Sequence, residues 1–418
     1  MTDLRRTALS SLRLHQTGWP RNGWRRAGWP RTGWPRTGWP RTGPARALGV
    51  LASLALAGLP AAFTAPPAAP GHIAALPTRL VAPFLHVSGN RLLNARGQRV
   101  VLRGINRSGG ETACVQGSGI WDGPMNQASV TAIRSWRVNA VRVPLNEACW
   151  NGQSYVRPAF RGANYRRAVL GYVRLLNRNG LVAILDLHFS DGAYLGASGN
   201  CRTSLAMCQK PMPDAAQSVP FWISVARAFK GNNAVVFDLF NEPFPDVATD
   251  SKAQGWRCLL LGGQACPGLS YRAVGMQSLV TAVRSTGARN VIMVGGLRWA
   301  DDVSQWLKFR PADPDHNLVA SWHVYSFNRC TVTTCWNSQV APVIARVPVV
   351  VGEMGERNCA DTFILPLMRW LDARSTGYLA WAWNSDFPCG AGPSLIRNYG
   401  GTPTRYGLGY RSHLRSLR

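Results

Sequence analysis

The chain has 418 residues, of which 46% are hydrophobic and 10% aromatic, and this composition excludes a wholly disordered protein. The formal charge is +27, but only four of the 47 basic residues are lysines. This arginine bias indicates codon usage more than a phosphate-binding surface, so we expect no nucleic-acid partner. The ten cysteines form no Cys-x-x-Cys pair, which favours disulfides and export over zinc binding or redox chemistry.

Residues 1–45 are predicted to be a low-complexity segment. Residues 18–42 repeat a pentapeptide of the Gly-Trp-Pro-Arg-Thr type five times, and Pro and Gly at this density prevent helix and sheet formation. Two alternatives stay open: a Trp/Arg segment that binds a membrane surface or nucleic acid, or a start of translation downstream of the repeat. Residues 1–46 contribute +9 to the charge, and the remainder of the chain carries +18.

Residues 46–66 have the pattern of a secretory signal. Arg46 precedes a short apolar run at residues 47–59, and small residues follow it. The run is too short for a stable membrane span. Residues 67–79 form a Pro/Ala-rich linker, and residues 80–418 keep one character to the end of the chain. We therefore expect a secreted protein, extracellular or periplasmic, with one catalytic domain at 80–418.

Short apolar runs alternate with segments of helical spacing throughout this domain. A hairpin that turns at Gly89-Asn90 is predicted first, over residues 85–93. Eight β-branched runs follow, at residues 100–106, 140–144, 181–188, 235–241, 290–295, 318–325, 347–353 and 377–383. Helical spacing is clearest at 128–136, 164–179, 219–229 and 271–285. Runs that are apolar on both faces predict a covered parallel sheet, and eight such units predict a single (β/α)8 TIM barrel of the α/β class. An open doubly wound sheet is the alternative, but no glycine-rich phosphate loop follows any run.

Polar or aromatic side chains end most of these runs. They are Asn106, Arg142, His188, Asn241, Glu242, His323, Tyr325, Glu353 and Trp383. In a barrel the carboxyl ends of the strands meet on one face, where the active site lies. A helix cap explains one such residue, but not a polar side chain at nearly every end.

Two of these residues are carboxylates, Glu242 in Phe-Asn-Glu-Pro and Glu353 in Val-Gly-Glu-Met-Gly. Paired carboxylates across a barrel mouth suit retaining glycoside hydrolysis, in which one donates a proton and the other attacks the anomeric carbon. A catalytically silent carbohydrate-binding barrel is one alternative. A basic protein that binds nucleic acid or the cell surface is another, and it predicts binding that weakens steeply with salt.

The order of these motifs resembles glycoside hydrolase family 5, the cellulase-like members of the clan of retaining (β/α)8 glycosidases. The resemblance runs from the entry hairpin and Leu-Arg-Gly-Ile-Asn at 102–106 to Trp383. It implies that Glu242 is the acid/base and Glu353 the nucleophile. It also implies that Asn241 binds the sugar 2-hydroxyl and that Arg142 and Tyr325 hold the nucleophile. His188 and His323 would bind sugar hydroxyls or orient the acid/base, and Trp383 would be the sugar platform.

The family includes enzymes for several polymers, and we expect an endo-β-1,4-glucanase, with β-mannan and β-1,3-glucan as alternatives. No cofactor or metal is expected, and the enzyme is expected to be a monomer. We expect Trp299 to be a further sugar platform in the loops. The other candidates are Trp121, Trp150, Trp306 and Trp336. Glu356, three residues after Glu353, is given no role.

All ten cysteines follow strand ends, so disulfides are expected to fasten the loops of the catalytic face. Neighbours in sequence are predicted to pair for three bridges: Cys201–Cys208, Cys258–Cys266 and Cys330–Cys335. Cys114–Cys149 and Cys359–Cys389 are predicted to join adjacent loops. Connectivity does not follow from sequence alone.

Overall fold

A computed structural model describes residues 81–417, apart from residues 195, 197–200, 202, 387 and 389. The pentapeptide repeat, the secretory signal and the linker predicted for residues 1–79 lie outside the described residues.

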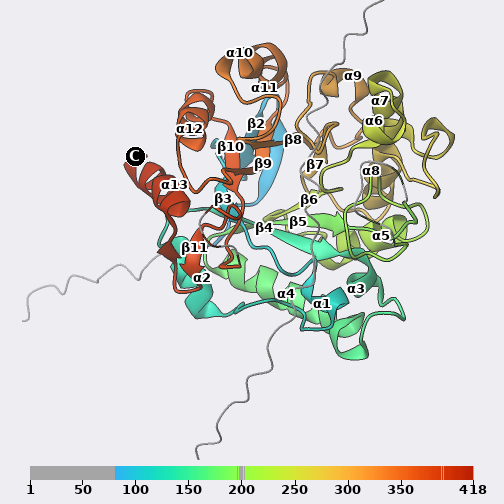
Figure 1. The fold of residues 1–418 in the computed structure, drawn as a ribbon, viewed down its shortest axis with the longest axis horizontal. Helices are drawn as coiled ribbons and strands as arrows, with labels where there is room; N and C mark the ends of the chain where they lie inside the picture. Colours follow the sequence, from blue (N-terminus) through green and yellow to red (C-terminus); the bar gives the residue numbers. More distant parts are fainter. Residues whose placement is uncertain are drawn as a thin grey trace, which may run out of the picture. The chain divides into compact units, whose positions relative to one another are not determined.

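Eight parallel strands close into a barrel, which confirms the predicted TIM-barrel fold. The strands are β3 (Arg103–Asn106), β4 (Ala140–Asn146), β5 (Val182–Phe189), β6 (Val235–Asp238), β7 (Ile292–Gly295), β8 (Leu318–Tyr325), β9 (Val349–Gly355) and β10 (Gly377–Ala380). Each lies within or overlaps one predicted run, and β10 pairs with β3 to close the ring. Helices surround the barrel on its outside (Figure 1).

The helices follow the strands as the spacing predicts. The longer ones are α2 (Gln127–Arg134), α4 (Ala163–Arg178), α5 (Ser218–Phe229), α7 (Lys252–Leu261), α8 (Met276–Arg284), α12 (Ile364–Asp372) and α13 (Arg405–Ser416). Short turns of helix are α1 (Ala113–Gln116), α3 (Glu147–Asn151), η1 (Pro158–Phe160), α6 (Pro245–Ala248), η2 (Gly263–Ala265), α9 (Trp306–Phe309), α10 (Thr333–Cys335), η3 (Trp336–Val340) and α11 (Ala341–Ile344). A short ribbon of β11 (Ile396–Asn398) and β12 (Thr402–Pro403) precedes α13. Among the described residues, no helix has the length and apolar composition of a transmembrane span.

One predicted helix begins later than its spacing suggests. Residues 271–275 are not helical, because Ala273 and Val274 form bridges to Asp214 and Gly262. Gly275 then lies against the backbone of Leu261, where a Cβ atom would come within 2.3 Å of the Leu261 carbonyl carbon. The local pairing therefore delays the start of α8 to Met276.

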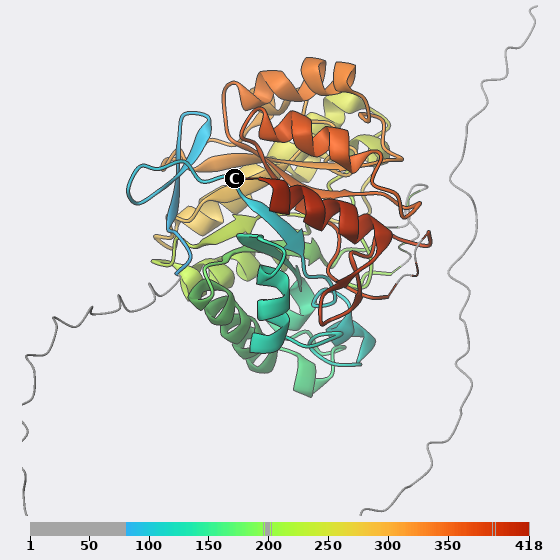
Figure 2. The same cartoon turned by 90° about the vertical axis from the view of Figure 1, so that its left-hand side faces the viewer.

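The predicted hairpin, β1 (Leu85–Ser88) and β2 (Arg91–Asn94), turns at Gly89-Asn90. It lies at one end of the barrel, opposite the loops that follow the strands (Figure 2). Leu85 and Leu92 join the apolar cluster inside the barrel, and the Leu85 amide donates to the Asn233 carbonyl at 2.9 Å. The hairpin thus closes the amino-terminal end of the barrel.

The interior of the barrel changes character along each strand. In β5, Val182 and Ile184 belong to the interior apolar cluster, and strand alternation places Asp186 and His188 on the same inward face. Towards the carboxyl ends of the strands, the barrel therefore holds buried polar and charged groups instead of an apolar core.

Strand β9 carries one extra residue just before Glu353. Trp322 of β8 pairs with Val351, but the next residue, His323, pairs with Glu353 and skips Gly352. Pairing with β10 shows the same extra residue on β9. Since Val350 faces inward, regular alternation would turn Glu353 away from the barrel axis. The bulge at Gly352 returns it to the inward face.

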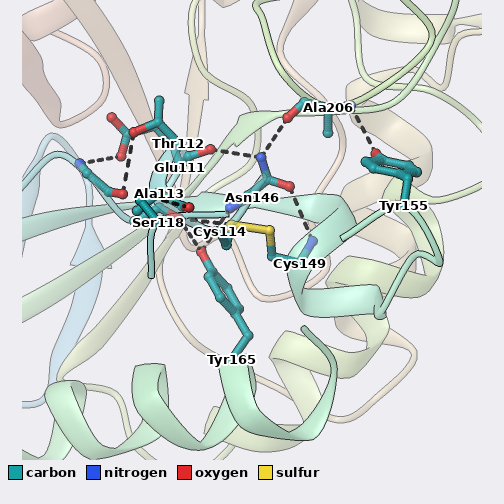
Figure 3. Close-up of a disulfide and its surroundings, with 12 residues drawn as sticks. Glu111, Thr112, Ala113, Cys114, Ser118, Asn146, Cys149, Tyr155, Tyr165 and Ala206 are labelled. Atoms are coloured by element: carbon teal, nitrogen blue, oxygen red, sulfur yellow. Dashed lines mark hydrogen bonds between the residues drawn. A yellow bond between two sulfur atoms is a disulfide. The ribbon is translucent and has the colours of Figure 1, made fainter. Parts of the chain in front are cut away.

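Four predicted disulfides are present and fasten loops of the mouth: Cys114–Cys149, Cys201–Cys208, Cys258–Cys266 and Cys330–Cys335. The first ties the loop after β3 to α3, beside the hydrogen bond from Tyr165 to the Gly110 carbonyl (Figure 3). Cys359 is also disulfide-bonded. Its expected partner, Cys389, lies outside the described residues, so that pairing stays a prediction.

Candidate active site

Arg142 is the centre of a buried ionic network at the barrel mouth. The fully buried guanidinium lies 2.8 Å from Asp186, 2.9 Å from Asp238 and 2.7 Å from Glu353. Burial alone would lower the pKa of Arg142, but the three carboxylates outweigh it and raise that pKa above its usual value. The cation therefore stays charged in the interior and holds the side chains around it.

Glu353 is bound through both carboxyl oxygens. Its Oε1 accepts a hydrogen bond from Arg142 Nη1 at 2.7 Å, and its Oε2 accepts one from the Tyr325 hydroxyl at 2.6 Å. The side chain is 4% exposed. Both partners donate to the carboxylate, so they fix its orientation.

Glu242 lies in a different environment. His323 Nδ1 is 3.2 Å from its Oε1, and Gln209 Nε2 donates to its Oε2 at 2.9 Å. Burial raises the pKa of Glu242 above its ordinary value, against the hydrogen bond from Gln209. The same cause lowers the pKa of His323 to about 4, so this imidazole is neutral near neutral pH. Burial therefore drives Glu242 towards its protonated form.

The two carboxyl groups face each other across a short gap. An oxygen of Glu242, one of Glu353 and a ring nitrogen of His323 lie within 4.8 Å of one another. Among the described residues this is the one set with the spacing of metal ligands. A cation is disfavoured there, because Arg142 and Tyr325 already donate to both Glu353 oxygens.

Asn241 and His188 line the same site. The Asn241 side-chain oxygen accepts from Arg142 Nη2 at 3.0 Å, which leaves the amide hydrogens as the group available to a ligand. Its nitrogen lies 3.4 Å from His188 Nε2. His188 is oriented by Asp186, 2.7 Å from its Nδ1, and burial lowers the pKa of His188.

Trp383, the expected sugar platform, is buried, whereas Trp381, the alternative on the same strand run, is partly exposed. Trp383 is fully buried and packs edge-on against Trp136, with ring centroids 4.9 Å apart, so no sugar can reach its face. Trp381 is partly exposed and stacks on His188, with centroids 5.5 Å apart and planes inclined by 15°. Strand β10 ends at Ala380, so strand alternation does not carry both tryptophans into the site.

Trp299 is partly exposed near the site and stacks on Phe244, two residues after Glu242, with centroids 4.8 Å apart. Of the other loop tryptophans, Trp121 is partly exposed, whereas Trp150, Trp306 and Trp336 are buried. Glu356 accepts hydrogen bonds from the amides of Phe363 and Ile364, at the start of α12. Its contacts are those of a structural cap.

Sequence reasoning missed three residues that build the site: Asp186, Asp238 and Gln209. Asn106 was identified as a strand end without a role, and its side-chain oxygen accepts a hydrogen bond from Arg142 Nη1 at 3.0 Å. A signal for the two aspartates exists, because each interrupts an apolar strand that leads to a predicted site residue. An aspartate in such a strand requires a buried cation, and Arg142 in β4 is the complementary signal. Gln209 lies in a long loop and gives no such signal.

Comparisons with known proteins decide the family. The family model of cellulase (glycosyl hydrolase family 5) matches residues 93–387, more than half of the chain. The chain belongs to glycosyl hydrolase family 5. This family 5 enzyme is therefore a glycosidase, as its sequence predicts.

Relatives of the family 5 enzyme are distant in sequence. It is 24% identical over 294 residues to β-mannanase/endoglucanase A of Caldicellulosiruptor saccharolyticus, covering 68% of this chain and 19% of that protein. It is 25% identical over 312 residues to a mannan endo-1,4-β-mannosidase of Streptomyces lividans, covering 72% of this chain and 66% of the relative. A mannan endo-1,4-β-mannosidase of Salipaludibacillus agaradhaerens is 21% identical over 311 residues, with coverage of 72% and 82%. The chain thus spans only about a fifth of the Caldicellulosiruptor protein.

Solved structures share the fold at still lower identity. A β-glucanase from Saccharophagus degradans superposes with a TM-score of 0.60 and 17% identity, covering 80% of this chain and 93% of that one. A mannotriose complex of a Thermomonospora fusca β-mannanase has a TM-score of 0.56 and 19% identity, with coverage of 81% and 98%.

Proposed function

We propose that the enzyme is a retaining endo-glycanase that cleaves a β-1,4-linked hexose polymer by double displacement. The observation that carries the proposal is the pair Glu242 and Glu353, whose carboxyl oxygens approach within 4.8 Å. Retaining glycosidases hold their carboxyl groups ~5–5.5 Å apart, whereas inverting enzymes need ~6.5–9.5 Å to admit a water molecule.

In the first step, the Glu353 carboxylate attacks the anomeric carbon while Glu242 delivers its proton to the departing glycosidic oxygen. Arg142 and Tyr325 hold Glu353 and aim it before the attack. Glu242 must instead carry a proton to donate, and burial raises its pKa so that the proton stays available. The C–O bond to the leaving sugar breaks as the bond to Glu353 forms.

In the second step, the ionised Glu242 takes a proton from water, and the resulting hydroxide displaces Glu353 from the anomeric carbon. Two inversions leave the product in the β configuration. The Asn241 amide is placed to donate to the sugar 2-hydroxyl, because its oxygen is already bound to Arg142. Trp381 offers its partly exposed indole as the apolar platform under the sugar.

The family resemblance favours β-1,4-glucan as the substrate. β-Mannan is the second candidate, and one observation favours it: two of the three relatives described above are mannan endo-1,4-β-mannosidases. Glucose and mannose differ in the orientation of the 2-hydroxyl, so the environment of Asn241 and His188 is where the enzyme would distinguish them.

We also propose that the enzyme is secreted. The described residues contain four disulfides, and such bonds persist in oxidising compartments. Fractionation of the expressing cells, with the enzyme followed by immunoblot, tests this, and retention in the cytosol would contradict it.

The catalytic proposal is tested by product analysis on carboxymethylcellulose, galactomannan and a β-1,3-glucan. We expect cleavage of at least one β-1,4-linked polymer into mixed oligosaccharides. Proton NMR of early products should show the β-anomer first. An initial α-anomer would mean an inverting site, and binding without cleavage would identify a silent carbohydrate-binding barrel.

A further inference from the structure

Gln209 makes the second of two side-chain contacts that fix Glu242. Its Nε2 lies 2.9 Å from the Glu242 side-chain oxygen Oε2 and 3.3 Å from the Glu242 main-chain carbonyl. The other carboxyl oxygen faces His323 Nδ1 at 3.2 Å. Each oxygen of the carboxyl group therefore has one side-chain partner, and Gln209 also grips the backbone of the same residue.

The backbone of Glu242 needs such support. Its φ is 51°, in the left-handed region that a residue with a Cβ atom rarely adopts. This conformation is unfavourable for a residue with a Cβ atom and persists where the surroundings hold it. A side-chain amide that bonds both the carbonyl and the carboxyl of Glu242 ties the side-chain direction to the strained backbone.

The segment that carries Gln209 is itself held firmly. The disulfide Cys201–Cys208 closes the loop immediately before it. Lys210, the next residue, donates its ammonium hydrogens to the Thr203 and Leu205 carbonyls at 2.7 and 3.0 Å.

The same loop is fastened to the barrel at Ala206. Its carbonyl accepts a hydrogen bond from Asn146 at the end of β4, at 2.7 Å, and its amide donates to the Tyr155 hydroxyl at 3.0 Å (Figure 3). Asn146 also binds the Glu111 carbonyl at 2.8 Å, beside the Cys114–Cys149 bridge. Gln209 is thus held beside Glu242 by a segment that a disulfide and several hydrogen bonds fix in place.

We propose that Gln209 is a positioning residue for the acid/base: it aims the Glu242 carboxyl group and helps the group to ionise between the two steps of the reaction. The inference rests on the proposed function, which gives Glu242 that role. An amide donor stabilises the carboxylate over the carboxylic acid, so it opposes the burial that raises the pKa of Glu242. Burial favours the acid needed in the first step, and Gln209 favours the base needed in the second.

Several charged or titratable groups also face Glu242. They are Arg142 on β4, Asp186 and His188 on β5, His323 and Tyr325 on β8, and Glu353 on β9. Gln209 is uncharged, so its replacement by Leu removes a donor and leaves every one of these charges in place. A change in the pH profile of that variant then reports on the hydrogen bond.

The test compares Gln209→Leu with the wild-type enzyme, using kcat/KM as a function of pH on the polymer identified by product analysis. We expect about a tenfold loss at the optimum and a basic limb displaced upward by about half to one pH unit, as for loss of one hydrogen bond to a charged group. Gln209→Glu keeps the size but removes the donor, and it should displace the basic limb at least as far. Gln217→Leu, the same change in the same inter-strand segment without contact to Glu242, should leave the profile unchanged.

A merely structural role for Gln209 would lower stability or activity without moving the basic limb. An unmoved limb in both Gln209 variants would therefore overturn the proposal, even if activity fell. Glu242→Gln separates this failure from failure of the proposed function. If Glu242→Gln destroys polymer hydrolysis while the Gln209 variants keep the wild-type limb, only the role of Gln209 is wrong. If Glu242→Gln retains full polymer hydrolysis, the acid/base assignment is wrong and the role of Gln209 falls with it.

Discussion

The two ends of the barrel are built from the same eight strands but hold opposite kinds of side chain. At the amino-terminal end, Val182, Val236 and Met293 pack in an apolar cluster under the entry hairpin. At the carboxyl end, the same inward face of the strands carries buried charges around Arg142. Apolar packing and chemistry are thus separated along the strand axis, within a few residues of each other.

The largest effect is expected from breaking the catalytic pair at the charged end. Glu353→Gln should lower kcat on every substrate by more than about 10⁴-fold, because no group replaces the nucleophile. Glu242→Gln should lower polymer hydrolysis by about 10²–10⁴-fold. It should cost much less in the first step on an aryl glycoside with an acidic phenol, which leaves without a proton. Pre-steady-state release of the phenol measures that step, and equal losses in the two variants would contradict the assigned roles.

Removing the cation of the charged end tests whether its network also supports the fold. Arg142→Met leaves Asp186, Asp238 and Glu353 buried without their counter-ion, and we expect a loss of about 3–5 kcal/mol in the free energy of unfolding. Urea denaturation followed by tryptophan fluorescence measures it. Arg142→Lys retains the charge without the planar fork, so it should recover part of the stability but little activity. Stability equal to wild type in Arg142→Met would show that the network serves chemistry alone.

A cavity at the apolar end should have the complementary effect. Met293→Ala removes a fully buried side chain from the interior cluster, and we expect a loss of about 3 kcal/mol in unfolding free energy. The kcat/KM per folded molecule should stay within about twofold of wild type, since the charged layer lies between this residue and the substrate. A large loss of kcat/KM below the unfolding temperature would mean that the two ends are coupled.

The smallest effect is expected from Trp381, at the outer edge of the charged end. Trp381→Ala should lower kcat/KM by about tenfold, equivalent to about 1.4 kcal/mol of lost sugar contact, with little change in melting temperature. Trp383→Ala is the matched control, because Trp383 is buried against Trp136. It should instead lower the melting temperature markedly. The reverse pattern would restore Trp383 as the platform.

The positions of the strands could be predicted because each is a compact apolar run between polar segments. The convergence of Arg142, Glu242 and Glu353 followed from their places at strand ends, since a parallel barrel brings all such ends to one face. Which side chains of a strand point into the barrel, and which point towards the helices, could not be predicted in the same way. Both faces of these strands are apolar, so the alternation that distinguishes inside from outside is absent from the sequence.

Other features depend on contacts between distant segments. Gln209 follows the Cys201–Cys208 disulfide in a long inter-strand segment, and only a tertiary contact brings it to Glu242. Trp381 and Trp383 have the same spacing as two inward residues of a strand, but β10 ends at Ala380, before both. Tertiary contacts, including the packing of Trp136 on Trp383, decide which of the two indoles meets solvent.

Gly352 shows that this active site depends on the register of a strand as well as on its side chains. The glycine is skipped in the pairing of β9 with β8, its carbonyl accepts a hydrogen bond from Asn106 at 2.9 Å, and a Cβ atom there would lie 2.7 Å from His323 Nε2. If β9 ran without the bulge, with Gly352 in the ladder, Glu353 would turn towards the helices although every catalytic side chain would still be encoded. A homologue that retains both glutamates but carries a larger residue before the second one must therefore move His323 or give up the bulge, so the residue at this position is also diagnostic of activity.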